Sequence, residues 1–144
     1  VINDLENDTF FAKIILDVVS GLSPAHQTIV RSSSNLLLLI EPEATSVAAA
    51  IVRLQQLLAW GARSEQITCV LLNRQGTALL SLHEIENQLG QTIVGMIPPA
   101  LETLAIATQY GTPLVLYKPD HMTSVTYADL VAAVIDRSLT VVTP

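Results

Sequence analysis

Residues able to hold a ligand stand where the apolar runs of this sequence stop. They are Asp17 followed by Ser20-Gly21, then Glu41-Pro42-Glu43, Asn73-Arg74 and Pro98-Pro99. If each run is a strand of an open parallel sheet, these residues lie at the carboxyl ends of the strands, where such sheets bind ligands. Each group also has a local reading, because aspartate and asparagine are ordinary turn residues and glutamates suit the entry to a helix. The histidines are scattered, and no serine or cysteine has the spacing of a catalytic triad.

Five short apolar runs are the predicted strands that would position these residues. They cover residues 11–19, 35–42, 66–74, 92–99 and 113–119. The runs lack alternation of apolar and polar residues, which is typical of strands covered on both faces and favours a parallel sheet flanked by helices. Leu36 to Ile40 is expected to be a central strand, stopped by Pro42 because proline cannot continue the ladder.

Segments with helical periodicity separate the runs. The predicted helices begin at Ser23-Pro24, at Thr45, at a Ser81/Glu84 capping box, near Leu101 and near Tyr127, and glycines 61, 90 and 111 follow three of them. Strand and helix therefore alternate, and no linker or internal repeat divides the chain. We expect a single α/β domain over 1–144, with three α/β/α layers and a mainly parallel, Rossmann-like sheet.

The composition narrows the classes of function. The chain has 144 residues, 13 acidic and 7 basic, with a formal net charge of −6 and no basic cluster, so we expect no direct binding to nucleic acid. The single cysteine, Cys69, lies in an apolar run, as a buried thiol in a reducing cytoplasm would. No metal-ligand spacing is present, and no apolar run reaches the roughly 18 residues of a membrane span. We expect a cytoplasmic protein.

The motifs at the run ends, taken in order, resemble the second half of a known family. The segments "IILDVVSGL", "LLLLIEPEATSVAAA", "CVLLNR", "IENQLGQTIVGMIPP" and "LAIATQYGTPLVLYKP" are similar to MinD/ParA-type P-loop ATPases of the SIMIBI class, including CpaE-like pilus-assembly members. Each motif alone is weak, but five in sequence cover nearly the whole chain from Phe11. The resemblance implies a P-loop NTPase-like fold and an ATP-dependent homodimer that positions pili, division sites or DNA cargo.

The resemblance also implies roles for single residues. Asp17 would hold a magnesium-bound water or sense the γ-phosphate, and Ser20 and Gly21 would offer backbone amides to phosphate. Asn73 and Arg74 match the adenine-contacting strand end, and Pro98 and Pro99 would wall the adenine pocket. The sequence departs from the family pattern at Val19, where a proline is common, and at Ala100-Leu101, where an acidic residue is often found.

A Gly-Lys dipeptide, part of the P-loop that holds the phosphates of ATP, is absent from these 144 residues. We therefore interpret the chain as the C-terminal half of such an ATPase, with the P-loop half upstream, and expect Mg-ATP to bind only to the full-length parent. The alternative is a non-catalytic regulatory or interaction module of a signalling protein, attached to a receiver domain.

MinD-type members that bind membrane end in a basic amphipathic helix, whereas "AAVIDRSLTVVTP" carries one arginine and no lysine, so we expect no membrane binding. A sheet that lacks neighbouring strands should expose an apolar flank at 14–18 or 36–40. We expect this flank to be buried by self-association or by residues 1–10, and we predict a homodimer or larger.

Overall fold

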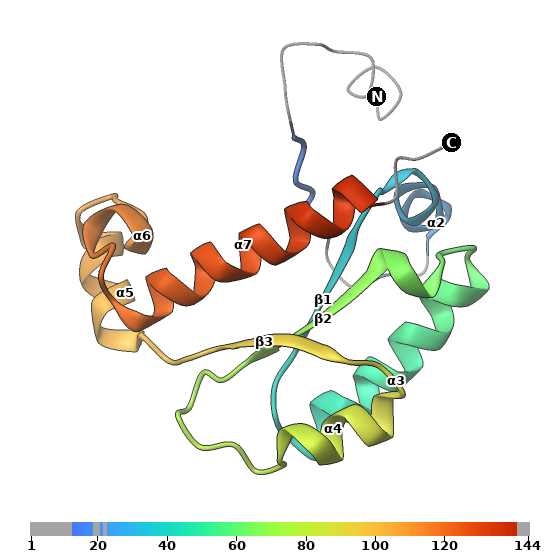
Figure 1. Cartoon of the computed structure of the whole chain (residues 1–144), viewed down its shortest axis with the longest axis horizontal. Coiled ribbons are helices and arrows are strands. Elements are labelled where there is room, and N and C mark those ends of the chain that lie inside the picture. The colour runs from blue at the N-terminus through green and yellow to red at the C-terminus, as the bar shows by residue number, and fades with distance from the viewer. Residues whose placement is uncertain (1–12, 19–20, 22, 141–144) are drawn as a thin grey trace.

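The described residues form a central parallel sheet of three strands (Figure 1). The computed structural model describes residues 13–18, 21 and 23–140, with side chains to residue 134. The strands are β1 (Leu36–Ile40), β2 (Ile67–Leu72) and β3 (Ile93–Ile97), in the order β1-β2-β3. The helices are α2 (Pro24–Ser32), α3 (Ala44–Ala59), α4 (Leu82–Leu89), α5 (Leu101–Gln109), α6 (Leu114–Tyr117) and α7 (Met122–Thr140), and the 3-10 turn η1 (Ser64–Gln66) precedes β2. The expected α/β fold with a parallel sheet is confirmed.

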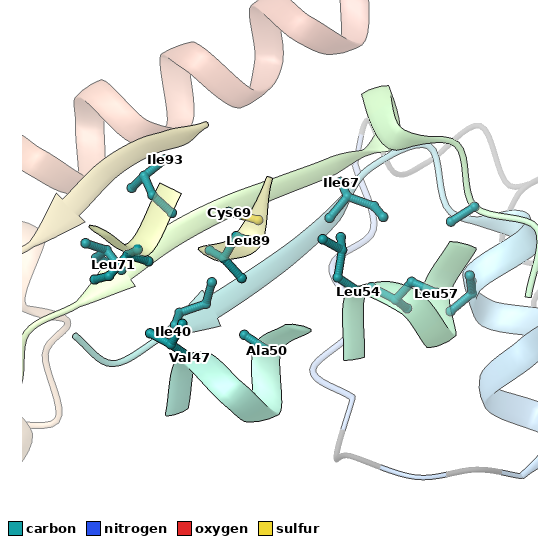
Figure 2. Packing of buried hydrophobic residues seen from close by; sticks show 13 residues of the cluster. Ile40, Val47, Ala50, Leu54, Leu57, Ile67, Cys69, Leu71, Leu89 and Ile93 are labelled. Atoms are coloured by element: carbon teal, nitrogen blue, oxygen red, sulfur yellow. The ribbon is translucent and has the colours of Figure 1, made fainter. Parts of the chain in front are cut away.

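Helices cover both faces of this sheet, with α3 and α4 on one side and α7 on the other (Figure 1). The larger core lies under α3 and α4, where Val47, Leu54 and Ile85 pack against Ile40 and Leu71 (Figure 2). A smaller core forms where Leu130 of α7 packs with Val70 and Ile97. The central strand β2 has both faces covered, which explains why its sequence is apolar without alternation.

The sequence-based expectation that Leu36–Ile40 is a central strand is wrong for the described sheet. β1 pairs only with β2 there, from Leu36 opposite Ile67 to Ile40 opposite Leu71, and so forms one edge. Ile40 is buried against α3, whereas Leu37 and Leu39 are 48% and 52% exposed. An apolar run without alternation predicts a strand covered on both faces, and the described residues cover only one face of β1.

Two other predicted strands differ from the structure. In the run 113–119, Leu114 to Tyr117 form the short helix α6 after Pro113, with the amide of Tyr117 donating to the carbonyl of Pro113. In the run 11–19, the described part, 13–18, belongs to no strand or helix and is exposed throughout. The reason for the first difference is that Gly111, at a φ of +60°, ends α5 and turns the chain into a new helix before a strand can start.

The predicted helix starts agree with the structure except for α7, which begins at Met122 and not near Tyr127, and for α3. Its N-cap is Glu43, and Thr45 lies inside the first turn, with its hydroxyl donating to the Glu43 carboxylate at 3.2 Å. The expected capping box opens α4: the Ser81 hydroxyl accepts from the Glu84 amide, and the Glu84 carboxylate accepts from the Ser81 amide. Gly90, at a φ of +63°, ends the same helix in a left-handed conformation that favours glycine. None of the described helices has the length and apolarity that a bilayer crossing requires.

Candidate functional site

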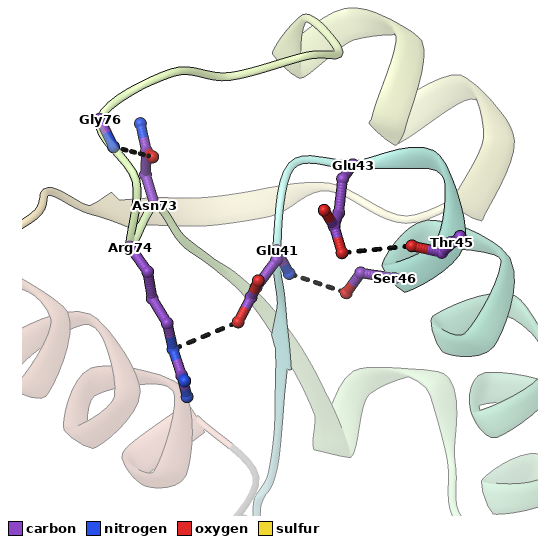
Figure 3. A network of polar contacts seen from close by, with 7 residues as sticks. All are labelled: Glu41, Glu43, Thr45, Ser46, Asn73, Arg74 and Gly76. Carbon is purple, nitrogen blue, oxygen red and sulfur yellow. Dashed lines mark hydrogen bonds and ion pairs between the residues drawn. The ribbon is translucent and has the colours of Figure 1, made fainter.

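The carboxyl ends of the three strands lie at one edge of the sheet, because the strands are parallel. Glu41 follows β1, Asn73 and Arg74 follow β2, and Pro98 follows β3. The Arg74 guanidinium contacts the Glu41 carboxylate, with 3.2 Å between Nε and Oε1 (Figure 3). The structure thus joins two of the sequence-predicted groups by an ion pair between neighbouring strand ends.

Asn73 shapes the turn that follows β2. Its side-chain oxygen accepts a hydrogen bond from the Gly76 amide at 2.9 Å, and its own amide donates to the Ile97 carbonyl at 3.0 Å (Figure 3). The residue is buried, and Gly76 takes a φ of +76°. Asn73 therefore has the local turn role that the sequence predicts, and the hydrogen bond from Gly76 uses its side-chain oxygen. Its side-chain NH2 group still offers two donors.

The loop after this turn is held against the end of β1. The Pro42 carbonyl accepts hydrogen bonds from the amides of Leu79 and Leu80, at 3.1 and 3.3 Å. The Glu41 amide donates to the Ser46 hydroxyl at 2.9 Å, which fixes the connection from β1 to α3 (Figure 3). These backbone contacts keep the Glu41 and Arg74 side chains together at the carboxyl ends of β1 and β2.

An open pocket of about 280 Å³ lies beside this ion pair, beyond the ends of β2 and β3. Its lining consists of Arg74, Gln75, Pro99, Ala100, Leu101, Glu102, Thr103 and His121. Two sequence-predicted residues, Arg74 and Pro99, are therefore brought together with the first turn of α5 and with the residue preceding α7. The pocket offers a guanidinium, a carboxylate and a histidine ring around a proline wall.

His121 was not among the sequence-predicted site residues, and neither were Glu102 and Thr103. The ring nitrogen Nδ1 of His121 accepts from the Thr123 amide at 3.2 Å, so the neutral ring carries its proton on Nε2 and can donate. Glu102 and Thr103 lie in the first turn of α5, just after β3. The signal that could have found them is their position directly beyond the carboxyl end of a parallel strand.

A smaller pocket of about 20 Å³, room for a single water, lies on the other side of Arg74. Its lining includes Glu41, Glu43, Asn73 and Arg74. Asn73 therefore lines the small pocket and not the large one, whereas Arg74 lines both. Pro98 lines neither of these pockets, and its carbonyl accepts from the Thr123 hydroxyl at 3.3 Å, which ties the start of α7 to the end of β3.

Among the remaining predicted site residues, Asp17 and Gly21 line neither pocket. Asp17 lies on the exposed segment 13–18, and Ser20 falls outside the described residues. The Gly21 carbonyl accepts from Arg53 Nη1 at 3.3 Å, and the His26 ring fills the space of a Cβ at Gly21. In the part of the chain that the structure describes, no group of three or more His, Cys, Asp or Glu residues could hold a metal ion. The magnesium role of Asp17 and the phosphate roles of Ser20 and Gly21 remain predictions.

A parallel sheet with helices on both faces defines a layered α/β protein, and its polar pocket at the strand ends lies where such sheets usually bind ligands. Among solved structures, the chain is similar to the MinD cell division protein of Aquifex aeolicus, with a TM-score of 0.78 and 22% identity over 94% of this chain. It is also similar to a ParA family ATPase from Chlorobium tepidum TLS, with a TM-score of 0.60 and 18% identity over 83% of this chain.

The likeness establishes a MinD-like P-loop NTPase fold, as the sequence motifs predict. The match takes in 58% of the MinD chain and 47% of the ParA family chain, so this chain spans about half the length of those proteins. No protein-family model and no curated protein sequence matches the chain.

Proposed function

We propose that this chain is the C-terminal half of a MinD/ParA-like ATPase that binds Mg-ATP in the full-length protein. The single observation that carries the proposal is the pocket of about 280 Å³, because Arg74 and Pro99, two positions that resemble the family's base-binding residues, both line it. The fold shared with MinD and the ParA family ATPase supports the same conclusion.

In this proposal the base of ATP lies in the large pocket, against Pro99 and between Arg74 and the first turn of α5. Arg74 is a donor for acceptor atoms of the base or ribose, and Glu102 can accept from an amino group. Asp17 would hold the magnesium-bound water, and Ser20 and Gly21 would contact phosphate. The full-length protein then acts as an ATP-dependent homodimer in the cytoplasm that positions pili, division sites or DNA cargo.

The phosphate-binding P-loop would come from the segment upstream of residue 1. Its amides and lysine supply most of the charge that holds a nucleoside triphosphate, and the 144 residues contain no Gly-Lys dipeptide. The isolated chain should therefore bind Mg-ATP at best weakly and should not hydrolyse it, whereas the full-length gene product should bind it at micromolar concentrations.

Calorimetric titration of Mg-ATP into the isolated chain and into the full-length gene product tests this function. Arg74→Ala in the full-length product should weaken binding by about tenfold, because a donor to the ligand is lost. Arg63→Ala is the matched control, since Arg63 is an exposed arginine before β2, at the opposite end of that strand. Micromolar affinity of the isolated chain, or equal affinities of the two variants, would contradict the proposal.

The alternative function is a non-catalytic regulatory or interaction module. The absent Gly-Lys dipeptide and the departures at Val19 and Ala100-Leu101 favour it. The upstream coding sequence discriminates the two functions: an intact Gly-Lys-Ser/Thr motif supports the ATPase, and a degenerate loop or a receiver domain supports the module.

A further inference from the structure

The ion pair between Glu41 and Arg74 joins two strand ends beside the large pocket. Glu41 directly follows β1, and Arg74 is the second residue after β2. Nε of Arg74 lies 3.2 Å from Oε1 of Glu41, and the two side chains are 66% and 35% exposed. Pairs as exposed as this add little to the stability of a fold, because water screens the charges and two long side chains lose freedom. The pair is therefore placed better to act on the pocket than to stabilise the sheet.

The backbone around Glu41 is fixed by three hydrogen bonds. The Glu41 amide donates to the Ser46 hydroxyl at 2.9 Å, and the carbonyl of the buried Pro42 accepts from the amides of Leu79 and Leu80. A proline at position 42 also restricts the residue before it to extended conformations. The Glu41 carboxylate therefore starts from a rigid part of the chain.

The Arg74 side chain, by contrast, is long and is held at one point. Apart from the ion pair with Glu41, the described residues give this side chain no ion pair and no hydrogen bond. The contact uses Nε, so the N–H groups of the two terminal nitrogens remain as donors (Figure 3). Arg74 also lines the large pocket, together with Pro99 and Glu102. A guanidinium that is held at Nε therefore keeps donors for a ligand in this pocket.

We propose that Glu41 is a positioning residue, which holds the Arg74 guanidinium in place for the ligand of the large pocket. A free arginine side chain loses rotational freedom when a ligand fixes it, and this loss weakens binding. Glu41 restrains the same side chain before the ligand arrives, so part of the loss has already occurred. This inference rests on the proposed function, in which Arg74 donates to the base or ribose of ATP.

The charges around the pocket agree with an uncharged group as the partner of Arg74. The carboxylate of Glu41 offsets the charge of the guanidinium, and Glu102 adds a second carboxylate to the lining. These two negative charges oppose a phosphate at this place, whereas the base and the ribose carry no charge for them to repel. Glu41 therefore both orients Arg74 and suits it to an uncharged acceptor.

NMR relaxation of the Arg74 Nε–H group in the 144-residue chain tests the positioning without a ligand. The order parameter of this group should lie above about 0.6 in the wild type and fall below it in Glu41→Ala, because the side chain is then unrestrained. Glu65→Ala is the matched control and should leave the order parameter unchanged, since Glu65 is an exposed glutamate before β2, at the opposite end of that strand. An Arg74 side chain that stays equally ordered in Glu41→Ala would overturn the inference.

A double-mutant cycle in the full-length gene product tests the effect on the ligand. Glu41→Ala should weaken Mg-ATP binding by about threefold to fivefold, and Glu65→Ala should change it by less than about twofold. In the Arg74→Ala background, Glu41→Ala should have no further effect, because it acts through Arg74. An equal loss in both backgrounds would contradict the positioning role. A full-length product in which Glu41 orders Arg74 but which binds no Mg-ATP would keep the positioning and remove the nucleotide function.

Discussion

Thr68 in β2 has a fully buried hydroxyl with no hydrogen-bond partner among the described residues. Such a hydroxyl has lost its hydrogen bonds to water on folding and has gained none in the protein. Thr68→Val should therefore raise the free energy of unfolding by about 1 kcal/mol. Thr123 is the matched control: it is also buried, but its hydroxyl donates to the Pro98 carbonyl. Thr123→Val should lower the same quantity by about 1–2 kcal/mol, because the carbonyl loses its partner. Urea unfolding of both variants measures the difference, and a destabilised Thr68→Val would show that its hydroxyl is satisfied.

At the same scale, the candidate site was only partly readable from the sequence. Arg74 and Pro99 were predictable because each follows an apolar strand, and they line the large pocket. The position of Asn73 at the end of a strand was predictable, but its contact with Gly76, whose amide donates to its side-chain oxygen, was not. His121 enters the pocket through the start of α7, far along the chain, and only the tertiary packing of α7 on β3 reveals it.

At the scale of single elements, the capping box of α4 links helix stability to pH. The hydrogen bonds from the Ser81 hydroxyl and amide hold the pKa of the Glu84 carboxyl below its ordinary value of 4.5. A lowered pKa means that the carboxylate stabilises the fold above the ordinary value and that this stabilisation is lost as the pH falls through the lowered one. Glu84→Gln should therefore be less stable than the wild type at pH 7, and the difference should shrink below about pH 4.5.

Urea unfolding of wild type and Glu84→Gln from pH 7 to pH 3 measures this difference directly. Ser81→Ala serves as the control, because it removes the hydroxyl that lowers the Glu84 pKa and should reduce the same pH dependence. A gap between wild type and Glu84→Gln that stays constant across this range would contradict the linkage.

An apolar run alone does not determine whether a segment forms a strand or a helix. The runs that became β1, β2 and β3 each have a parallel partner, whereas Leu114–Tyr117 has the same character and forms a single helical turn after Pro113. Short apolar runs suit a strand or a buried helix equally well, and the neighbouring glycine and proline decide between them. For residues 14–18 the sequence has the pattern of a strand, but the described residues supply no partner for it.

At the scale of the whole molecule, the open flank of the sheet at β1 is the feature that determines how the chain associates. The chain matches MinD over 94% of its own length but only 58% of the MinD chain, and the flank at β1 is where the described sheet lacks cover. In the proposed function, nucleotide binding depends on an upstream half that supplies the phosphate contacts.

The isolated 144-residue chain should therefore self-associate reversibly through this flank. Its exposed apolar side chains, Leu37 and Leu39, favour burial, and the unpaired edge of β1 offers backbone hydrogen bonds to any second strand. Light scattering across a dilution series should show a mass above the 15.5 kDa of one chain that falls towards it on dilution.

Leu39→Lys should shift the chain to the monomer, because a charge at the edge opposes pairing. Leu116→Lys is the control, since Leu116 is 73% exposed on α6, away from β1 (Figure 1). A monomer at every concentration would mean that the flank needs no cover, and dissociation by Leu116→Lys alone would place the contact on α6 instead.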